Sequence, residues 1–66
     1  MPFGRVIDFD GHVGLGHVAA ESGSVHLFHC VEIADGTRTI QLGAAVQFDL
    51  MVKLGEQEAA NVRPAM

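Results

Sequence analysis

The chain has 66 residues, with eight acidic residues against four lysines and arginines, and a formal net charge of −4. A protein that binds nucleic acid mainly by neutralising phosphates carries a basic patch, so this composition argues against tight, nonspecific nucleic-acid binding. The single cysteine, Cys30, excludes an internal disulfide. No run reaches the roughly 18 apolar residues of a membrane span, and the N-terminus lacks the pattern of a signal peptide. We therefore expect a single cytoplasmic domain over residues 1–66.

Five short runs bounded by turn signals follow one another along the chain, and each has the length of a strand. They cover residues 5–9, 14–19, 25–29, 44–54 and 58–63. In the fourth run, Val46, Phe48 and Leu50 alternate with polar residues. This period of two is typical of a strand with one buried face.

Between the third and fourth runs, CVEIADGTR predicts a short helical turn and then a loop around Asp35-Gly36. No longer stretch has a helical period. Five short strands in a small domain predict an all-β, five-stranded antiparallel barrel that is closed or nearly closed, because closure removes exposed strand edges. The predicted core consists of Val6, Val18, Phe28, Ile33, Val46, Phe48, Leu50 and Val62.

The stretch HVGLGHV, residues 12–18, places Gly14 and Gly16 inside an expected strand, where glycine is unfavourable because it offers no side chain to pack. With the residues before it, GRVIDFDGHVGLGHV resembles the opening of bacterial cold-shock domains, whose usual pattern is GKVKWFNxxKGFGFI. HLFHC falls where that family has a second motif, roughly VFVHF, with His29 on its histidine. QEAANVR resembles the family's ending, PQAANV, so the resemblance covers nearly the whole chain.

The resemblance implies an OB-type barrel whose second and third strands present a face to nucleic acid. In the family, aromatic rings on this face stack on single-stranded bases, and each stack is worth about 1–3 kcal/mol. The two glycines would let the backbone curl and keep the space between the rings clear. Most of those rings are replaced here. The residues that stand at the family's tryptophan, motif lysine and phenylalanines are Asp8, Val13, Leu15, His17, Leu27 and Cys30.

The resemblance therefore implies a weak or specialised module that binds single-stranded DNA or RNA and is not an enzyme. Losing four rings at about 1 kcal/mol each lowers the affinity by about three decades. We expect dissociation constants of about tens of micromolar or weaker at physiological salt. The predicted nucleic-acid-binding residues are Arg5, Phe9, Leu15, His17, Leu27, His29 and Arg38.

The alternative is a protein-interaction or homo-oligomerising barrel that has lost nucleic-acid binding. Leu15 and Leu27 in place of rings suit a protein partner, because exposed apolar patches often mark interfaces. The charge around the face distinguishes the two readings. A positive rim from Arg5, Arg38 and Lys53 favours nucleic acid, whereas an acidic patch centred on leucine favours a protein.

The four histidines and Cys30 carry groups that suit zinc or copper, but their spacing matches no metal motif. Cys30 follows His29 directly, and neighbours in a strand point to opposite faces, which disfavours a catalytic pair. We therefore expect no metal, no cofactor and no catalytic residue. A further hypothesis is that protonation of the histidines near pH 6.5 offsets the net charge of −4 and favours phosphate binding.

Overall fold

The computed structural model describes residues 2–34 and 40–65. It contains one antiparallel sheet with the strand order β3-β2-β1-β4-β5. The elements are β1 Phe3–Asp10, β2 Leu15–Ala20, β3 Val25–His29, the 3-10 helix η1 Cys30–Glu32, β4 Ala45–Lys53 and β5 Glu56–Pro64. The five predicted strands and the helical turn are confirmed, whereas the loop predicted around Asp35-Gly36 lies outside the described residues. Within the described ranges, no helix is long and apolar enough to cross a membrane.

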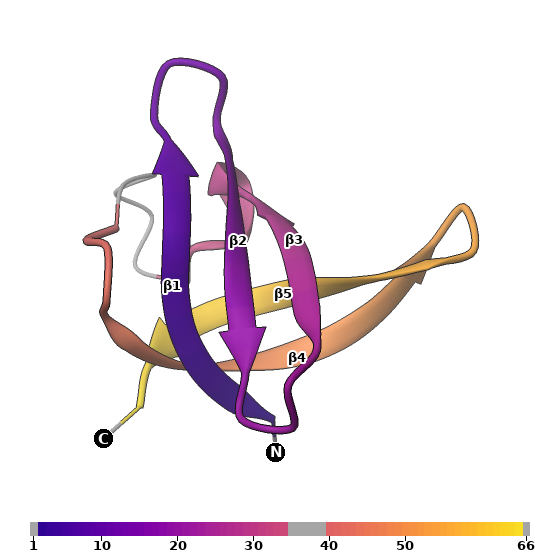
Figure 1. Cartoon of the computed structure of the whole chain (residues 1–66). Helices are drawn as coiled ribbons and strands as arrows, with labels where there is room; N and C mark the ends of the chain where they lie inside the picture. Colours follow the sequence, from indigo (N-terminus) through magenta and orange to yellow (C-terminus); the bar gives the residue numbers. More distant parts are fainter. Residues whose placement is uncertain (1, 35–39, 66) are drawn as a thin grey trace.

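The sheet curls so that its two edge strands, β3 and β5, approach each other. Figure 1 shows β1, β2 and β3 side by side, with β4 and β5 running across them. Among the described residues the sheet is not closed by a strand ladder between β3 and β5. Instead, Nδ1 of His26 on β3 donates a hydrogen bond to the carbonyl of Gln57 on β5, at 3.1 Å. Ile33 forms a single parallel bridge to Val62, so the predicted closure is only partial.

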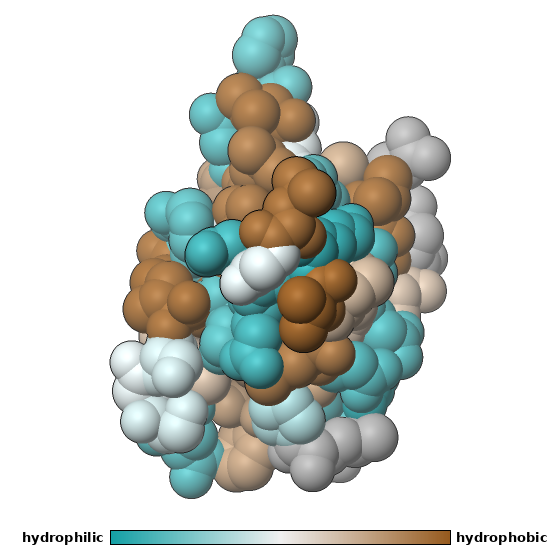
Figure 2. Space-filling model, turned by 90° about the vertical axis from the view of Figure 1, so that its right-hand side faces the viewer, coloured by the Kyte–Doolittle hydropathy of each residue, from teal (hydrophilic) through white to brown (hydrophobic). Residues whose placement is uncertain are grey.

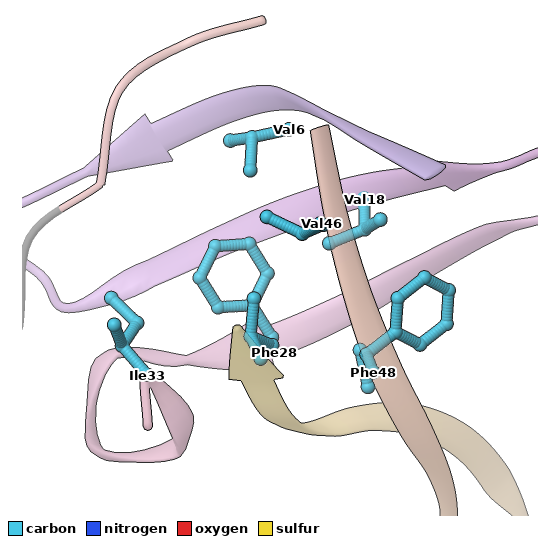
Figure 3. Close-up of a cluster of buried hydrophobic side chains, with 8 residues drawn as sticks. Val6, Val18, Phe28, Ile33, Val46 and Phe48 are labelled. Atoms are coloured by element: carbon cyan, nitrogen blue, oxygen red, sulfur yellow. The ribbon is translucent and has the colours of Figure 1, made fainter. Parts of the chain in front are cut away.

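Eight buried apolar side chains fill the space inside the curled sheet, and Figure 3 shows most of them. They are Val6, Val18, Phe28, Ile33, Val46, Phe48, Ala59 and Val62. Seven of the eight predicted core residues are thus confirmed. The prediction that Leu50 belongs to the core is wrong, because 43% of the residue is exposed; Ala59 is buried instead.

The exposure of Leu50 results from the geometry of the β4–β5 hairpin. The pairing register shifts between Gln47 and Asp49, opposite Asn61, whose φ is +52°. Beyond this bulge the hairpin projects away from the rest of the sheet (Figure 1). The alternating pattern of β4 therefore continues past the end of the core, and Leu50 and Val52 lie on the surface.

The two glycines of the HVGLGHV stretch have separate structural reasons. A Cβ on Gly16 would lie 2.7 Å from Cζ of Phe28 and 2.8 Å from the carbonyl oxygen of Asp8. Gly14 has a φ of +84°, and a Cβ there would lie 3.0 Å from the sulfur of Cys30. Gly16 thus makes room for a core ring, and Gly14 allows the turn into β2.

Replacing His26 with alanine should destabilise the domain by about 2–3 kcal/mol. The ring is 9% exposed, packs 6.0 Å from the Phe48 ring, and provides the bond to the Gln57 carbonyl across the β3–β5 gap. Its loss leaves a cavity and an unpaired carbonyl. Urea unfolding measures the change, with His12→Ala on the exposed β1–β2 turn as the matched control. Equal midpoints for the two variants would contradict this role.

Candidate nucleic-acid interface

The pairing of β2 with β3 brings four of the predicted binding residues together. Leu15 lies opposite His29, and His17 lies opposite Leu27. All four are partly exposed, while the residues that alternate with them, such as Phe28, point into the core. We call the surface formed by Leu15, His17, Leu27 and His29 the β2–β3 face.

Asp8 lies at the edge of this face and contacts His17. A register shift between Val6 and Asp8 places Asp8 directly opposite His17 on β2. Oδ1 of Asp8 lies 2.8 Å from Nδ1 of His17, and the two side chains are 63% and 42% exposed. The imidazole N–H of His17 therefore donates to the carboxylate of Asp8. This hydrogen bond holds the two side chains in a fixed orientation relative to each other.

A second carboxylate, Glu58 on β5, reaches the face from the other side. Its Oε1 lies 3.3 Å from Nδ1 of His29 and 3.8 Å from Nζ of Lys53. The His29 and Glu58 atoms are buried and do not have the geometry of a hydrogen bond. Sequence reasoning missed Glu58, although QEAANVR places it at the glutamine of the family's PQAANV ending.

Of the other predicted binding residues that the structure describes, Arg5 lies apart from the four, whereas Phe9 lies beside them and lines a hollow together with Leu15 and His17. The guanidinium of Arg5 donates to the carbonyl of Gly43 at 2.9 Å, and Arg5 lines a different hollow. The ring of Phe9 stacks on the core ring of Phe28, with centroids 5.9 Å apart and planes 6° from parallel. Phe9 is thus partly a packing residue. Arg38 lies outside the described residues.

The charge around the β2–β3 face is not positive in the part of the chain that the structure describes. Asp8, Asp10 and Glu58 border it, and Lys53 is the cation beside it, already close to Glu58. Figure 2 shows the molecule from the side on which the β4–β5 hairpin projects. Hydrophilic and hydrophobic residues are interspersed over this side. Among the described residues, a phosphate at this face therefore meets more carboxylates than cations.

The histidines have different environments, and two of the four belong to the face. His26 is buried between β3 and β5, and His12 is exposed on the β1–β2 turn. A charge gained by protonation would thus act directly on the face only at His17 and His29. In residues 2–34 and 40–65, no group of three or more histidine, cysteine or acidic side chains is arranged to hold a metal ion.

A small curled antiparallel sheet with a two-stranded outer face is the architecture of OB-type binding modules. The chain matches the family model of the 'cold-shock' DNA-binding domain over residues 3–65. It belongs to this family, whose domains are non-catalytic and bind single-stranded nucleic acid. No curated protein sequence matches the chain closely enough to add to this assignment.

Proposed function

We propose that this domain binds single-stranded DNA or RNA weakly on the β2–β3 face. The observation that carries the proposal is the cross-strand pairing of Leu15 with His29 and of His17 with Leu27. These are positions at which the family's motifs place its stacking residues and its histidine. The two leucines offer apolar contact, and the two partly exposed imidazoles offer flat rings to exposed bases.

Two features of the face support weak binding. Flat aromatic rings, which contribute most of the stacking energy in such domains, are absent from the β2–β3 face apart from the two imidazoles. Asp8 and Glu58 oppose the approach of phosphates, and Glu58 also lies 3.8 Å from the amine of Lys53, whose charge it offsets. We therefore place the dissociation constant at about tens of micromolar or higher.

The same charge distribution supports a second candidate function, an interface with a protein. The described surface around Leu15 and Leu27 carries more carboxylates than cations, which is the pattern expected for a protein partner or a second copy of the chain. Nucleic acid remains the first candidate because the family assignment covers residues 3–65.

Fluorescence anisotropy with labelled single-stranded oligonucleotides tests the proposal. Thymine-rich and mixed sequences, as DNA and as RNA, would be titrated at about 50 and about 200 mM salt. We expect saturable binding that weakens with salt and weakens further in Leu27→Ala. Leu42→Ala, which removes an equally large side chain from a surface outside the sheet, is the control and should bind as the unmodified domain does.

Absence of any binding up to about 100 μM protein would reject nucleic-acid binding as the function. The second candidate would then be tested by sedimentation of the domain alone over the same concentration range. Equal losses in Leu27→Ala and Leu42→Ala would instead place any bound strand away from the β2–β3 face.

A further inference from the structure

A hollow lies beside the β2–β3 face and is large enough for one nucleobase. It is lined by Asp8, Phe9, Asp10, Val13, Leu15 and His17, and its volume is about 330 Å³. Sites for small organic ligands begin at about 300 Å³, so the hollow suits a single base better than a longer stretch of strand.

The walls of the hollow are apolar and partly fixed. Phe9 is held against the core by its stack on Phe28. Val13 and Leu15 add aliphatic surface to the lining. The hollow therefore offers apolar groups to the faces of a base and polar groups to its edge.

The polar groups of the hollow are mainly hydrogen-bond acceptors. Oδ1 of Asp10 accepts bonds from the backbone N–H groups of His12 and Val13, at 3.0 and 3.2 Å, so Asp10 is engaged in the β1–β2 turn. Oδ1 of Asp8 accepts from His17. Among the described residues, Oδ2 of Asp8 has no hydrogen-bond partner, and the side chain is 63% exposed.

An oriented carboxylate distinguishes between bases by the donors on their edges. A carboxylate has two oxygens with about four lone-pair sites, so Asp8 can keep its bond to His17 and still accept two more. The Watson–Crick edge of guanine presents two adjacent donors, N1–H and the 2-amino group, which match the two oxygens. Thymine and uracil present a single N–H between two carbonyl oxygens, and these are repelled by the carboxylate.

We propose that the Asp8–His17 pair selects guanine in single-stranded nucleic acid. Asp8 contacts the base edge, and His17 is a positioning residue that holds the carboxylate in a fixed direction. This inference rests on the proposed function, because it requires a strand on the β2–β3 face. It assigns a role to Asp8, which otherwise only opposes the phosphates of the strand.

The test compares oligonucleotides of about eight nucleotides in which one central position is varied in a thymine background. A single guanine per strand avoids self-association of guanine-rich sequences. We expect the guanine strand to bind about 10-fold more tightly than all-thymine, the low end of discrimination by a bidentate contact. Hypoxanthine, which lacks the 2-amino group, should bring the affinity to within about threefold of thymine.

Three variants test which residue causes the preference for guanine. Asp8→Ala should abolish the guanine preference and tighten thymine binding, because the carboxylate that repels thymine carbonyls and phosphates is removed. Glu21→Ala removes the same charge on the turn after β2 and should keep the preference. His17→Phe keeps a flat ring on the face, so thymine binding should persist while the guanine preference falls severalfold.

The outcomes separate this inference from the proposed function. Saturable binding with equal affinity for guanine and thymine overturns the selection by Asp8 and leaves the proposed function standing. A guanine preference that survives in Asp8→Ala also overturns it. If no strand binds up to about 100 μM protein, both the selection and the proposed function fail.

Discussion

Replacing both Leu15 and Leu27 with phenylalanine should tighten the binding of thymine-rich single strands by about 30-fold. The two positions lie on adjacent strands of the β2–β3 face, each opposite a histidine. Each added ring gives about 1 kcal/mol of stacking at the low end of the measured range, and the two together give about 2 kcal/mol. Both leucines are only partly buried, so the larger side chains extend outward rather than into the core.

Anisotropy titrations of the double variant against the unmodified domain measure the gain. Leu42→Phe adds the same ring at an exposed position outside the sheet and serves as the control. An unchanged affinity in the double variant would contradict a strand lying on this face. An equal gain in Leu42→Phe would show that the added ring acts nonspecifically.

The Gly16→Ala variant should lose about 3 kcal/mol of its free energy of unfolding, at the upper end of overpacking costs. The new Cβ would lie 2.7 Å from Cζ of Phe28 and 2.8 Å from the carbonyl oxygen of Asp8. Phe28 is fully buried and stacks on Phe9, and a backbone carbonyl in a sheet cannot rotate away. The clash therefore displaces either the core ring or the pairing of β1 with β2.

Thermal unfolding followed by circular dichroism measures this loss, which corresponds to a melting temperature lowered by about 12–24 °C in a domain of this size. Gly11→Ala is the control, because its Cβ would make only an ordinary contact, 3.5 Å from Cε2 of Phe9. A melting temperature for Gly16→Ala equal to that of Gly11→Ala would show that the core accommodates the methyl group.

The sequence predicted the strands well because their alternation and turn residues are local signals. It also predicted which residues of β2 and β3 share a face, since strand parity fixes the direction of each side chain. The error at Leu50 has a definite cause. A period of two continues along a hairpin whether or not a core lies beneath it, so the pattern cannot show where the core ends.

Two contacts between distant parts of the chain were not predictable in the same way. Glu58 reaches His29 across the gap between β5 and β3, and no local pattern reports that approach. The pairing of Asp8 with His17 depends on a bulge in β1, which shifts the register by one residue. His26 did carry a usable signal, because it has the same parity as the buried Phe28.

The pleat of β2 and β3 makes this domain a useful scaffold for engineered binders. Buried residues on these strands alternate with partly exposed residues that face the outer surface. The outer set can therefore be varied in a library while Val18, Phe28 and Gly16 are held constant. Selection for a new ligand would then operate on one set of side chains, and the requirement for folding on the other.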